Sequence, residues 1–430
     1  MLILLIFVLF ILFIIFTLPI AFSIELSTLI VLFAEGNGNA LMTVLTKLFT
    51  GINASSYLAI PFFILAGSLM EHGGISERIL KFANGLVGHL RGGLALVQVL
   101  FGILFAAVTG SAVAATTAVG SIMMPAMNKK GYDKGFVAAL QACAGTLGPI
   151  IPPSVSMIII AAMTNESVAN LFLAGIIPGI LIGVFLMFVG YRYAKKNDIP
   201  LEPKMPAKEM AKAGLESLWA LLAPVIIIGG ILSGKFTATE AGMISCVYSI
   251  LVGVFVYKQL DLKTFLNALR GSVLGTAQIL FLIAMSNVFA WILTSLNFGT
   301  LCSELLNGIT DNSVVFMLIM IAFFLVIGCF IDVSAACTIF IPILYPIANT
   351  YGVGFPFLII VLMTMAIGQI TPPVGVLLSL TSEMQEIKLT ATFKYLPSVL
   401  GAMLLATLIC AIFPQIINLL PHFIGTLPGL

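Results

Sequence analysis

The sequence predicts an all-α polytopic membrane protein, and the observations behind that prediction are its composition and its long apolar runs. Of the 430 residues, 60% are hydrophobic and only 8% are charged, whereas about a quarter of the residues in a soluble domain are charged. A membrane helix needs about 20 apolar residues, so with about 15 for each connection the chain has room for roughly a dozen spans. A soluble enzyme, a nucleic-acid-binding protein and a disordered scaffold are excluded.

Residues 1–22 are almost wholly apolar and predict a first membrane helix that is retained. A signal peptide needs basic residues before its apolar core, and the first basic residue here is Lys47. The six cysteines form no Cys-x-x-Cys pair and the three histidines are scattered, so we expect no cofactor and no catalytic centre. No Walker loop or nucleophile elbow occurs either, which argues against ATP-driven transport and against an enzyme.

Basic residues predict the orientation of the chain, because loops on the cytoplasmic side carry an excess of Lys and Arg. All but two of the 19 basic residues fall into five clusters. The clusters are Arg78, Lys81 and Arg91; Lys129, Lys130 and Lys134; Arg192, Lys195, Lys196, Lys204, Lys208 and Lys212; Lys258, Lys263 and Arg270; and Lys388 and Lys394. If all five are cytoplasmic, residues 134–165, 168–191, 215–234, 240–257 and 272–294 are successive crossings, and both termini lie outside.

Two apolar stretches predict helical hairpins that open to opposite faces of the membrane. Residues 92–128 have basic residues on both flanks, whereas residues 313–349 have none on either flank. The first hairpin should therefore enter and leave on the inside, and the second on the outside. Residues 76–90 and 261–270 predict short amphipathic helices along the inner surface.

Related motifs follow the two hairpins and indicate an internal duplication. GPIIPP at 148–153 and GQITPP at 368–373 share four of six residues, and both come after a hairpin with a similarly spaced Gly and Pro. Five crossings separate the hairpins, so the second copy is inverted, an arrangement typical of secondary transporters. Consecutive prolines interrupt a helix, and the freed carbonyl oxygens suit a hard cation such as Na⁺. A simple kink is the alternative.

Polar residues within the hairpins mark candidate ligands. An acid inside a membrane segment is costly and by default functional, so Asp332 predicts an ion-related role. Glu240 is also acidic, but Thr237-x-x-Glu240 is the spacing of a capping box, which favours a structural role.

Several stretches resemble the large membrane subunit of TRAP (tripartite ATP-independent periplasmic) transporters. They are IPFFILAGS at 60–68, GGI at 73–75, VGHLRGG at 87–93, GSAVA at 110–114, PAM and GY within 125–132, GPIIPP at 148–153, GxxPG at 175–179, TxTEA at 237–241 and TPP at 371–373. The resemblance covers nearly the whole chain.

This resemblance implies an elevator-type, Na⁺-coupled importer of an organic acid anion in the bacterial inner membrane. Its partners would be a small four-helix membrane subunit and a soluble periplasmic substrate-binding protein. The mobile transport domain would comprise residues 92–165 and 313–382, each a hairpin and an interrupted helix. The scaffold would comprise residues 1–91, 166–312 and 383–430.

The resemblance also implies two Na⁺ sites and a substrate pocket. The first Na⁺ site matches Thr109, Ser111, Gly148, Ile151 and Pro153, and the second matches Gly328, Asp332, Gly368, Thr371 and Pro373. No basic side chain within the hairpins could hold a carboxylate, so Ser111, Thr116 and Thr338 are the candidate substrate ligands. Some relatives carry an acid where this chain has Ala115.

Other functions stay open at this point. A stand-alone Na⁺/divalent-anion symporter would have the same inverted hairpins without a binding protein. An ion channel could use the Pro-Pro breaks as pore lining, and an intramembrane enzyme would need a nucleophile, base or metal cluster. C4-dicarboxylates, sialic acid, other sugar acids and keto acids are all possible substrates.

Overall fold

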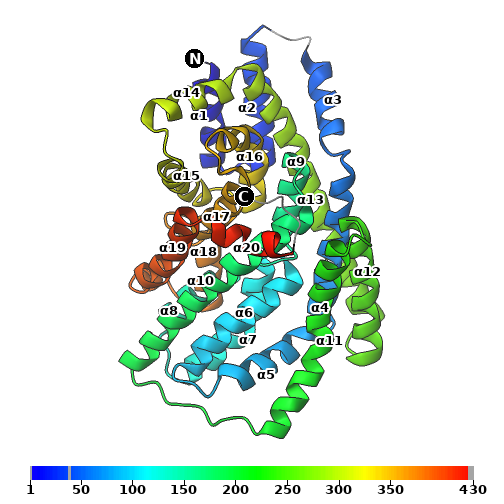
Figure 1. Ribbon diagram of the computed structural model, residues 1–430, viewed down its shortest axis with the longest axis vertical. Helices are drawn as coiled ribbons and strands as arrows, with labels where there is room; N and C mark the ends of the chain where they lie inside the picture. The colour runs from blue at the N-terminus through cyan, green and yellow to red at the C-terminus, as the bar shows by residue number, and fades with distance from the viewer. Residues whose placement is uncertain (1, 37–39, 425–430) are drawn as a thin grey trace.

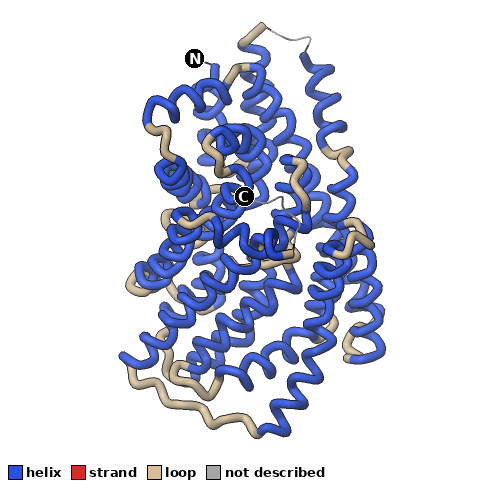
Figure 2. The backbone as a smooth tube through the Cα atoms, viewed as in Figure 1, coloured by secondary structure: helices blue, strands red, loops and turns tan. Residues whose placement is uncertain are grey.

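The computed structural model describes residues 2–36 and 40–424, and all regular structure in these ranges is helical, without a strand (Figure 2). In chain order the elements are α1 (Leu2–Ile15), α2 (Ile20–Ala34), α3 (Leu41–Gly51), η2 (Ser55–Leu58), α4 (Ala59–His72), α5 (Ile75–Val87), α6 (Gly93–Thr109), α7 (Ala112–Lys129), α8 (Lys134–Gly145), α9 (Val155–Thr164), α10 (Val168–Lys196), α11 (Ala207–Leu232), α12 (Ala238–Leu251), η3 (Val252–Val256), α13 (Leu262–Ser295), α14 (Phe298–Ile309), α15 (Ser313–Gly328), α16 (Val333–Thr350), α17 (Gly354–Gly368), α18 (Val376–Met384), η4 (Leu389–Thr392), α19 (Leu396–Ile412) and α20 (Gln415–Phe423). The all-α prediction is confirmed. The predicted placement of both termini concerns Met1 and residues 425–430, which lie outside the described residues.

Within the described chain, five helices are long and apolar enough to cross a membrane. They are α10, α11, α12 with η3, α13 and α16. Two pairs bent by 53° and 68°, α3 with η2–α4 and α19 with α20, raise the number to seven if each pair is one span. The other apolar helices have 10–17 residues. This number is lower than the dozen membrane segments for which the chain has room, because several apolar segments are divided into helices shorter than the bilayer is thick.

Residues 1–22 do not form the single helix that the sequence predicts. Helix α1 ends at Ile15, Thr17 has a left-handed backbone with φ of 62°, and α2 begins directly after Pro19. Proline lacks the amide hydrogen that a helix interior needs, but it is tolerated at a helix start. Pro19 therefore divides the segment into two helices, which pack against each other, and α2 also packs against α13.

Residues 92–128 form a pair of helices, α6 and α7, joined by Gly110 and Ser111. Gly110 has φ of 61°, a conformation that glycine adopts readily because it has no Cβ. Ser111 caps α7, and its hydroxyl accepts a hydrogen bond from the amide of Ala114 at 3.5 Å. The following span is broken between Gly145, where α8 ends, and Val155, where α9 begins. The Pro-Pro motif lies inside that break.

Residues 313–349 form the second pair, α15 and α16, with residues 329–332 between them. Asp332 caps α16, and its Oδ1 accepts a hydrogen bond from the amide of Ser334 at 2.8 Å. Helix α17 ends at Gly368 and α18 begins at Val376, so this second break also contains the Pro-Pro motif. In Figure 1, α6 and α7 occupy the lower half of the molecule, while α15 and α16 occupy the upper half.

Only the first of the two predicted surface helices is a separate element. It is α5, which is amphipathic and buries Ile75, Ile79 and Ala83. The predicted second helix, residues 261–270, is instead the beginning of α13, which continues unbroken through Gly271 to Ser295. A single glycine lowers helix propensity by about 1 kcal/mol without ending a helix, so the separation expected there does not occur.

Helix α13 is the longest described helix, and it packs against α2, α3, α4 and α16. Helix α12 packs on α4, and the capping box at its start is confirmed, because Glu240 accepts a hydrogen bond from the Thr237 amide at 2.7 Å. The residues between α10 and α11 run along the bottom of Figure 1, opposite the end where α1 begins. The site described next lies where α4 and α13 meet the two hairpin turns.

Candidate ion and substrate site

The turn of the first hairpin packs tightly into the first helix break. A Cβ added to Gly148 would lie 2.5 Å from the carbonyl carbon of Ser111, and one added to Gly110 would lie 2.5 Å from the carbonyl oxygen of Pro153. Only glycine fits at such separations. The hydroxyl of Ser154 donates to the carbonyl of Pro149 at 2.8 Å and holds the break in shape. Thr109, Ser111, Gly148 and Pro153 thus meet at one junction, which we call the first junction.

The turn of the second hairpin packs into the second break in the same way, and we call this contact the second junction. A Cβ on Gly368 would lie 2.4 Å from the Cα of Gly328. The side-chain amide of Gln369 donates from Nε2 to Oδ2 of Asp332 at 3.0 Å. The hydroxyl of Thr371 donates to the carbonyl of Ile367 at 2.8 Å.

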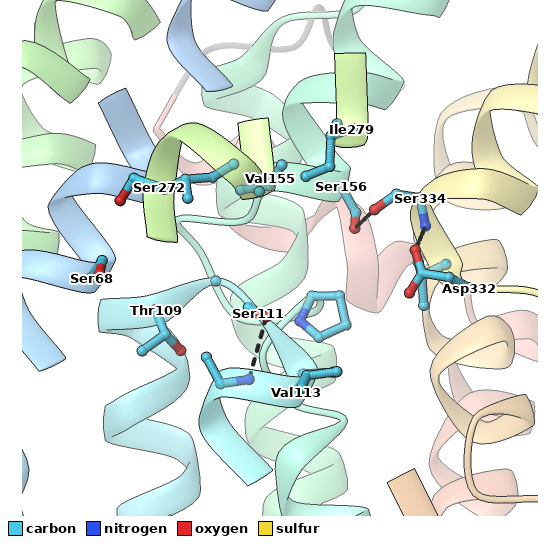
Figure 3. Close-up of a pocket in the computed structure, with 18 of the residues that line it drawn as sticks. Ser68, Thr109, Ser111, Val113, Val155, Ser156, Ser272, Ile279, Asp332 and Ser334 are labelled. Carbon is cyan, nitrogen blue, oxygen red and sulfur yellow. Dashed lines mark hydrogen bonds between the residues drawn. The ribbon is translucent and has the colours of Figure 1, made fainter. Parts of the chain in front are cut away.

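A cavity of about 310 Å³ lies between the two junctions. Helices α4 and α13 contribute Ser68, Glu71 and Ser272, the first junction contributes Thr109, Ser111 and Pro149, and the second contributes Asp332, Ser334 and Gln369. Figure 3 shows Ser68, Thr109, Ser111, Ser272, Asp332 and Ser334 around the cavity, on different helices and turns. The hydroxyls of Ser156 and Ser334 lie 3.4 Å apart and connect the two halves of the lining.

The cavity has an acidic lining. The carboxyl groups of Glu71 and Asp332 line it, and no Lys, Arg or His is present among its described lining residues. Its other polar groups are hydroxyls, backbone groups and one side-chain amide. The described residues contain no group of three or more His, Cys, Asp or Glu that could hold a metal ion. Hard cations that use carbonyl, hydroxyl and carboxylate oxygen fit this lining better than transition metals do.

Three of the residues singled out from the sequence line the cavity directly, Thr109, Ser111 and Asp332. The other residues of the two expected Na⁺ sets are not among its lining residues: Gly148, Ile151 and Pro153 lie in or at the first break, and Gly328, Gly368, Thr371 and Pro373 lie around the second junction. The glycines among them account for the close approach of turn and break.

Thr116 and Thr338 do not reach the cavity, contrary to the sequence-based expectation. Both are fully buried within their helices. The hydroxyl of Thr116 donates to the carbonyl of Ala112 at 2.7 Å, and that of Thr338 donates to the carbonyl of Ser334 at 2.6 Å. These bonds to the preceding turn are common for threonine in membrane helices.

Sequence reasoning missed Glu71 and Gln369. Glu71 lies near the end of the apolar helix α4 and is half-buried beside Ser68. The rule that singled out Asp332, an acid within an apolar segment, would have found it. Gln369 could have been found by comparing the two motifs, because it occupies the place of Pro149 in the first copy.

Comparisons with known proteins agree with this architecture. The family model for the tripartite ATP-independent periplasmic transporter, DctM component, matches residues 7–416. The chain is 40% identical over 380 residues to the C4-dicarboxylate TRAP transporter large permease protein DctM of Pseudomonas aeruginosa, which covers 88% of this chain and 89% of that protein. It is 34% identical over 407 residues to the sialic acid TRAP transporter permease protein SiaT of Haemophilus influenzae, with 94% of this chain but only 66% of that protein covered.

A solved structure shares the fold. The YdaH transporter of Alcanivorax borkumensis superimposes with a TM-score of 0.57, at 16% sequence identity, over 89% of this chain and 90% of that one. Family membership rests on the sequence matches, which span nearly all of the chain. The chain belongs to the DctM component family of the tripartite ATP-independent periplasmic transporters, as a large permease.

Proposed function

We propose that this permease imports an organic acid anion together with Na⁺ by an elevator movement, in which one part of the protein carries the cavity across the bilayer past a fixed part. The observation that carries the proposal is the cavity bounded by both junctions. In each of them, a hairpin turn packs on a helix break. Unwound backbone at helix breaks is the usual place where secondary transporters bind substrate and coupling ions.

The charge of the cavity supports coupling to cations. An organic acid anion entering beside Glu71 and Asp332 meets two acidic side chains and no basic side chain among the described lining residues. Since like charges at close range repel strongly where little water is present, binding of the anion requires cations that enter with it. The two junctions offer oxygen ligands for such cations at Thr109 and Ser111 in one case and at Asp332 in the other.

The packing supports division into a moving and a fixed part. The two hairpins and the two interrupted helices would form the moving part, and α4 and α13 belong to the fixed part. Across their boundary, α4 approaches the first turn through Gly67, where an added Cβ would lie 3.3 Å from the Cα of Thr109. Because the two hairpins of an inverted repeat open to opposite faces of the membrane, movement of this part would make the cavity accessible first from one face and then from the other.

Relatives support the substrate class and the partners. Those described above are named for C4-dicarboxylate and for sialic acid, both organic acids. The relative called a large permease has nearly the length of this chain, whereas about one third of SiaT, called only a permease, lies outside the match. The additional segment would correspond to the small membrane subunit, which this chain would bind as a separate protein. A periplasmic binding protein would deliver the substrate, and the complex would lie in the bacterial inner membrane.

Reconstitution into proteoliposomes tests the proposal. Uptake of labelled organic acids should require an inward Na⁺ gradient, the small subunit and the binding protein, and it should not require ATP. Undiminished uptake after Na⁺ is replaced by K⁺ or choline would disprove coupling. Saturable Na⁺-dependent uptake by the permease alone would favour a stand-alone symporter instead.

A further inference from the structure

Gln369 is an unusual buried side chain at the second junction. It is 3% exposed and lies directly after Gly368. Its Nε2 donates to Asp332, but its Oε1 is buried and has no hydrogen-bond partner among the described residues. Buried polar atoms are nearly always paired, so an unpaired acceptor beside a cavity indicates a missing ligand.

One backbone oxygen at the second junction is unpaired as well. The carbonyl oxygen of Gly328 accepts no hydrogen bond in the described chain, and it would lie 3.0 Å from a Cβ added to Gly368. Asp332 supplies an acidic side chain, and its two oxygens accept hydrogen bonds from the amide of Ser334 and from Nε2 of Gln369. The junction thus combines a fixed carboxylate with two acceptors that lack a donor.

The first junction has no such combination. Pro149 occupies the place of Gln369, and Ser111 caps α7 where Asp332 caps α16. Pro149 and Gln369 both line the cavity, as do Ser111 and Asp332. The two junctions are therefore alike in backbone geometry but different in charge, since the first offers only neutral oxygens from these positions.

Building on the Na⁺ coupling proposed above, we propose that Gln369 is a ligand of the cation at the second junction. Its Nε2 orients Asp332, and its Oε1 supplies a neutral oxygen to the same ion. Amide and carboxylate oxygens are the ligands that hard cations prefer. Because only the second junction has a carboxylate and an amide, it binds Na⁺ more tightly than the first and fills at a lower Na⁺ concentration.

Gln98 offers a matched control. It is also fully buried, its Nε2 donates to Gln141 at 2.8 Å, and its Oε1 has no partner among the described residues. Gln98 lies in α6 and does not line the cavity. The two glutamines therefore share residue type, burial and hydrogen-bonding state, and they differ in their distance from the expected ion.

The test measures Na⁺ binding through thermal unfolding of the purified complex of permease and small subunit. NaCl is titrated against choline chloride at constant ionic strength, because an ion that binds the folded state raises its melting temperature.

The tighter Na⁺ site accounts for the rise in melting temperature at the lower Na⁺ concentrations. Gln369→Met should increase the Na⁺ concentration that gives half of this rise by about tenfold or more. Gln98→Met should leave that concentration unchanged, even if it lowers the melting temperature. Gln369→Asn, which shortens the side chain but keeps the amide, should give an intermediate rise and decides the matter if Gln369→Met does not fold.

The outcomes separate this inference from the function it rests on. If the wild-type complex is stabilised by Na⁺ and the Gln369 variants respond as it does, Gln369 is not a ligand, while Na⁺ coupling stands. Equal rises in the Gln98 and Gln369 variants would show a general packing effect and also overturn the inference. If the Gln369 variants change which organic acids compete for uptake but not the Na⁺ response, Oε1 serves the substrate instead. Absence of any Na⁺ stabilisation in the wild type would remove both proposals.

Discussion

Gly328 and Gly368 touch through their backbones, with so little space between them that a Cβ on Gly368 would lie 2.4 Å from the Cα of Gly328. This contact joins the end of α15 to the end of α17, two helices that pack along their length. It fixes the second hairpin turn onto the second helix break and thereby places Asp332 at the cavity.

Gly368→Ala should separate the turn from the break. The new methyl group has no room, and overpacking of this kind costs about 1–3 kcal/mol. We expect a lower melting temperature and a severe loss of uptake. Gly401→Ala in α19 is the control, because no atom lies within 4 Å of its would-be Cβ, so it should be neutral or slightly stabilising. Equal stability and uptake in the two variants would show that the close contact is not required.

Asp332→Asn should weaken the response to Na⁺ without disturbing folding. Asparagine caps a helix as well as aspartate does, so the bond to the Ser334 amide can persist while the charge is lost. We expect normal expression and a severalfold higher Na⁺ concentration for half-maximal uptake. Glu240→Gln is the control: it perturbs a capping box at a cost of about 1 kcal/mol and should leave the Na⁺ dependence unchanged. An unaltered Na⁺ dependence in Asp332→Asn would mean that the acid is structural.

Glu71→Gln should favour binding of the anion. Glu71 is the second carboxylate that lines the cavity and comes from α4. Removing its charge reduces repulsion of the substrate, so at saturating Na⁺ the substrate concentration for half-maximal uptake should fall about threefold or more. The glutamine keeps the shape of the side chain, which limits packing effects. A rise in that concentration would instead identify Glu71 as a group that holds a cation or a donor of the substrate.

Cysteine labelling tests the orientation of the chain. Lys196 and Asn165 are both exposed; Lys196 is the last residue of α10, and Asn165 directly follows α9, three residues before α10 begins. In a background without the six native cysteines, Lys196→Cys should react only with reagents that reach the cytoplasm. Asn165→Cys should react from the outside. Labelling of both from one side would contradict the five crossings and the inverted repeat together.

The helix breaks are predictable from the sequence because they depend on residues close together in the chain. Gly110, the Pro-Pro motifs and the cap residues act through their own backbone or a bond to a neighbour, so their effect can be inferred from a few residues of sequence. The capping box at Thr237 and Glu240 was predictable for the same reason. Asp332 could be chosen because a charge in an apolar segment is conspicuous without knowledge of its surroundings.

Other features depend on what lies nearby in space. Whether a threonine hydroxyl faces the cavity or its own helix depends on rotamer and packing, so the sequence could not show that Thr116 and Thr338 lie outside the cavity lining. Glu71 comes from a helix far along the chain from Asp332, and only tertiary packing places both at one cavity. The division at Pro19 and the continuity of α13 through Gly271 reflect the balance between weak local preferences and packing.

The coupling ratio between Na⁺ and substrate is the most direct test of the account. It can be measured in proteoliposomes as the membrane potential and Na⁺ gradient at which net flux of the labelled organic acid stops. With one cation at each of the two junctions, we predict at least two Na⁺ for each substrate and a sigmoidal Na⁺ dependence of uptake. A flux that stops at a potential set by the substrate gradient alone, with no influence of Na⁺, would contradict it.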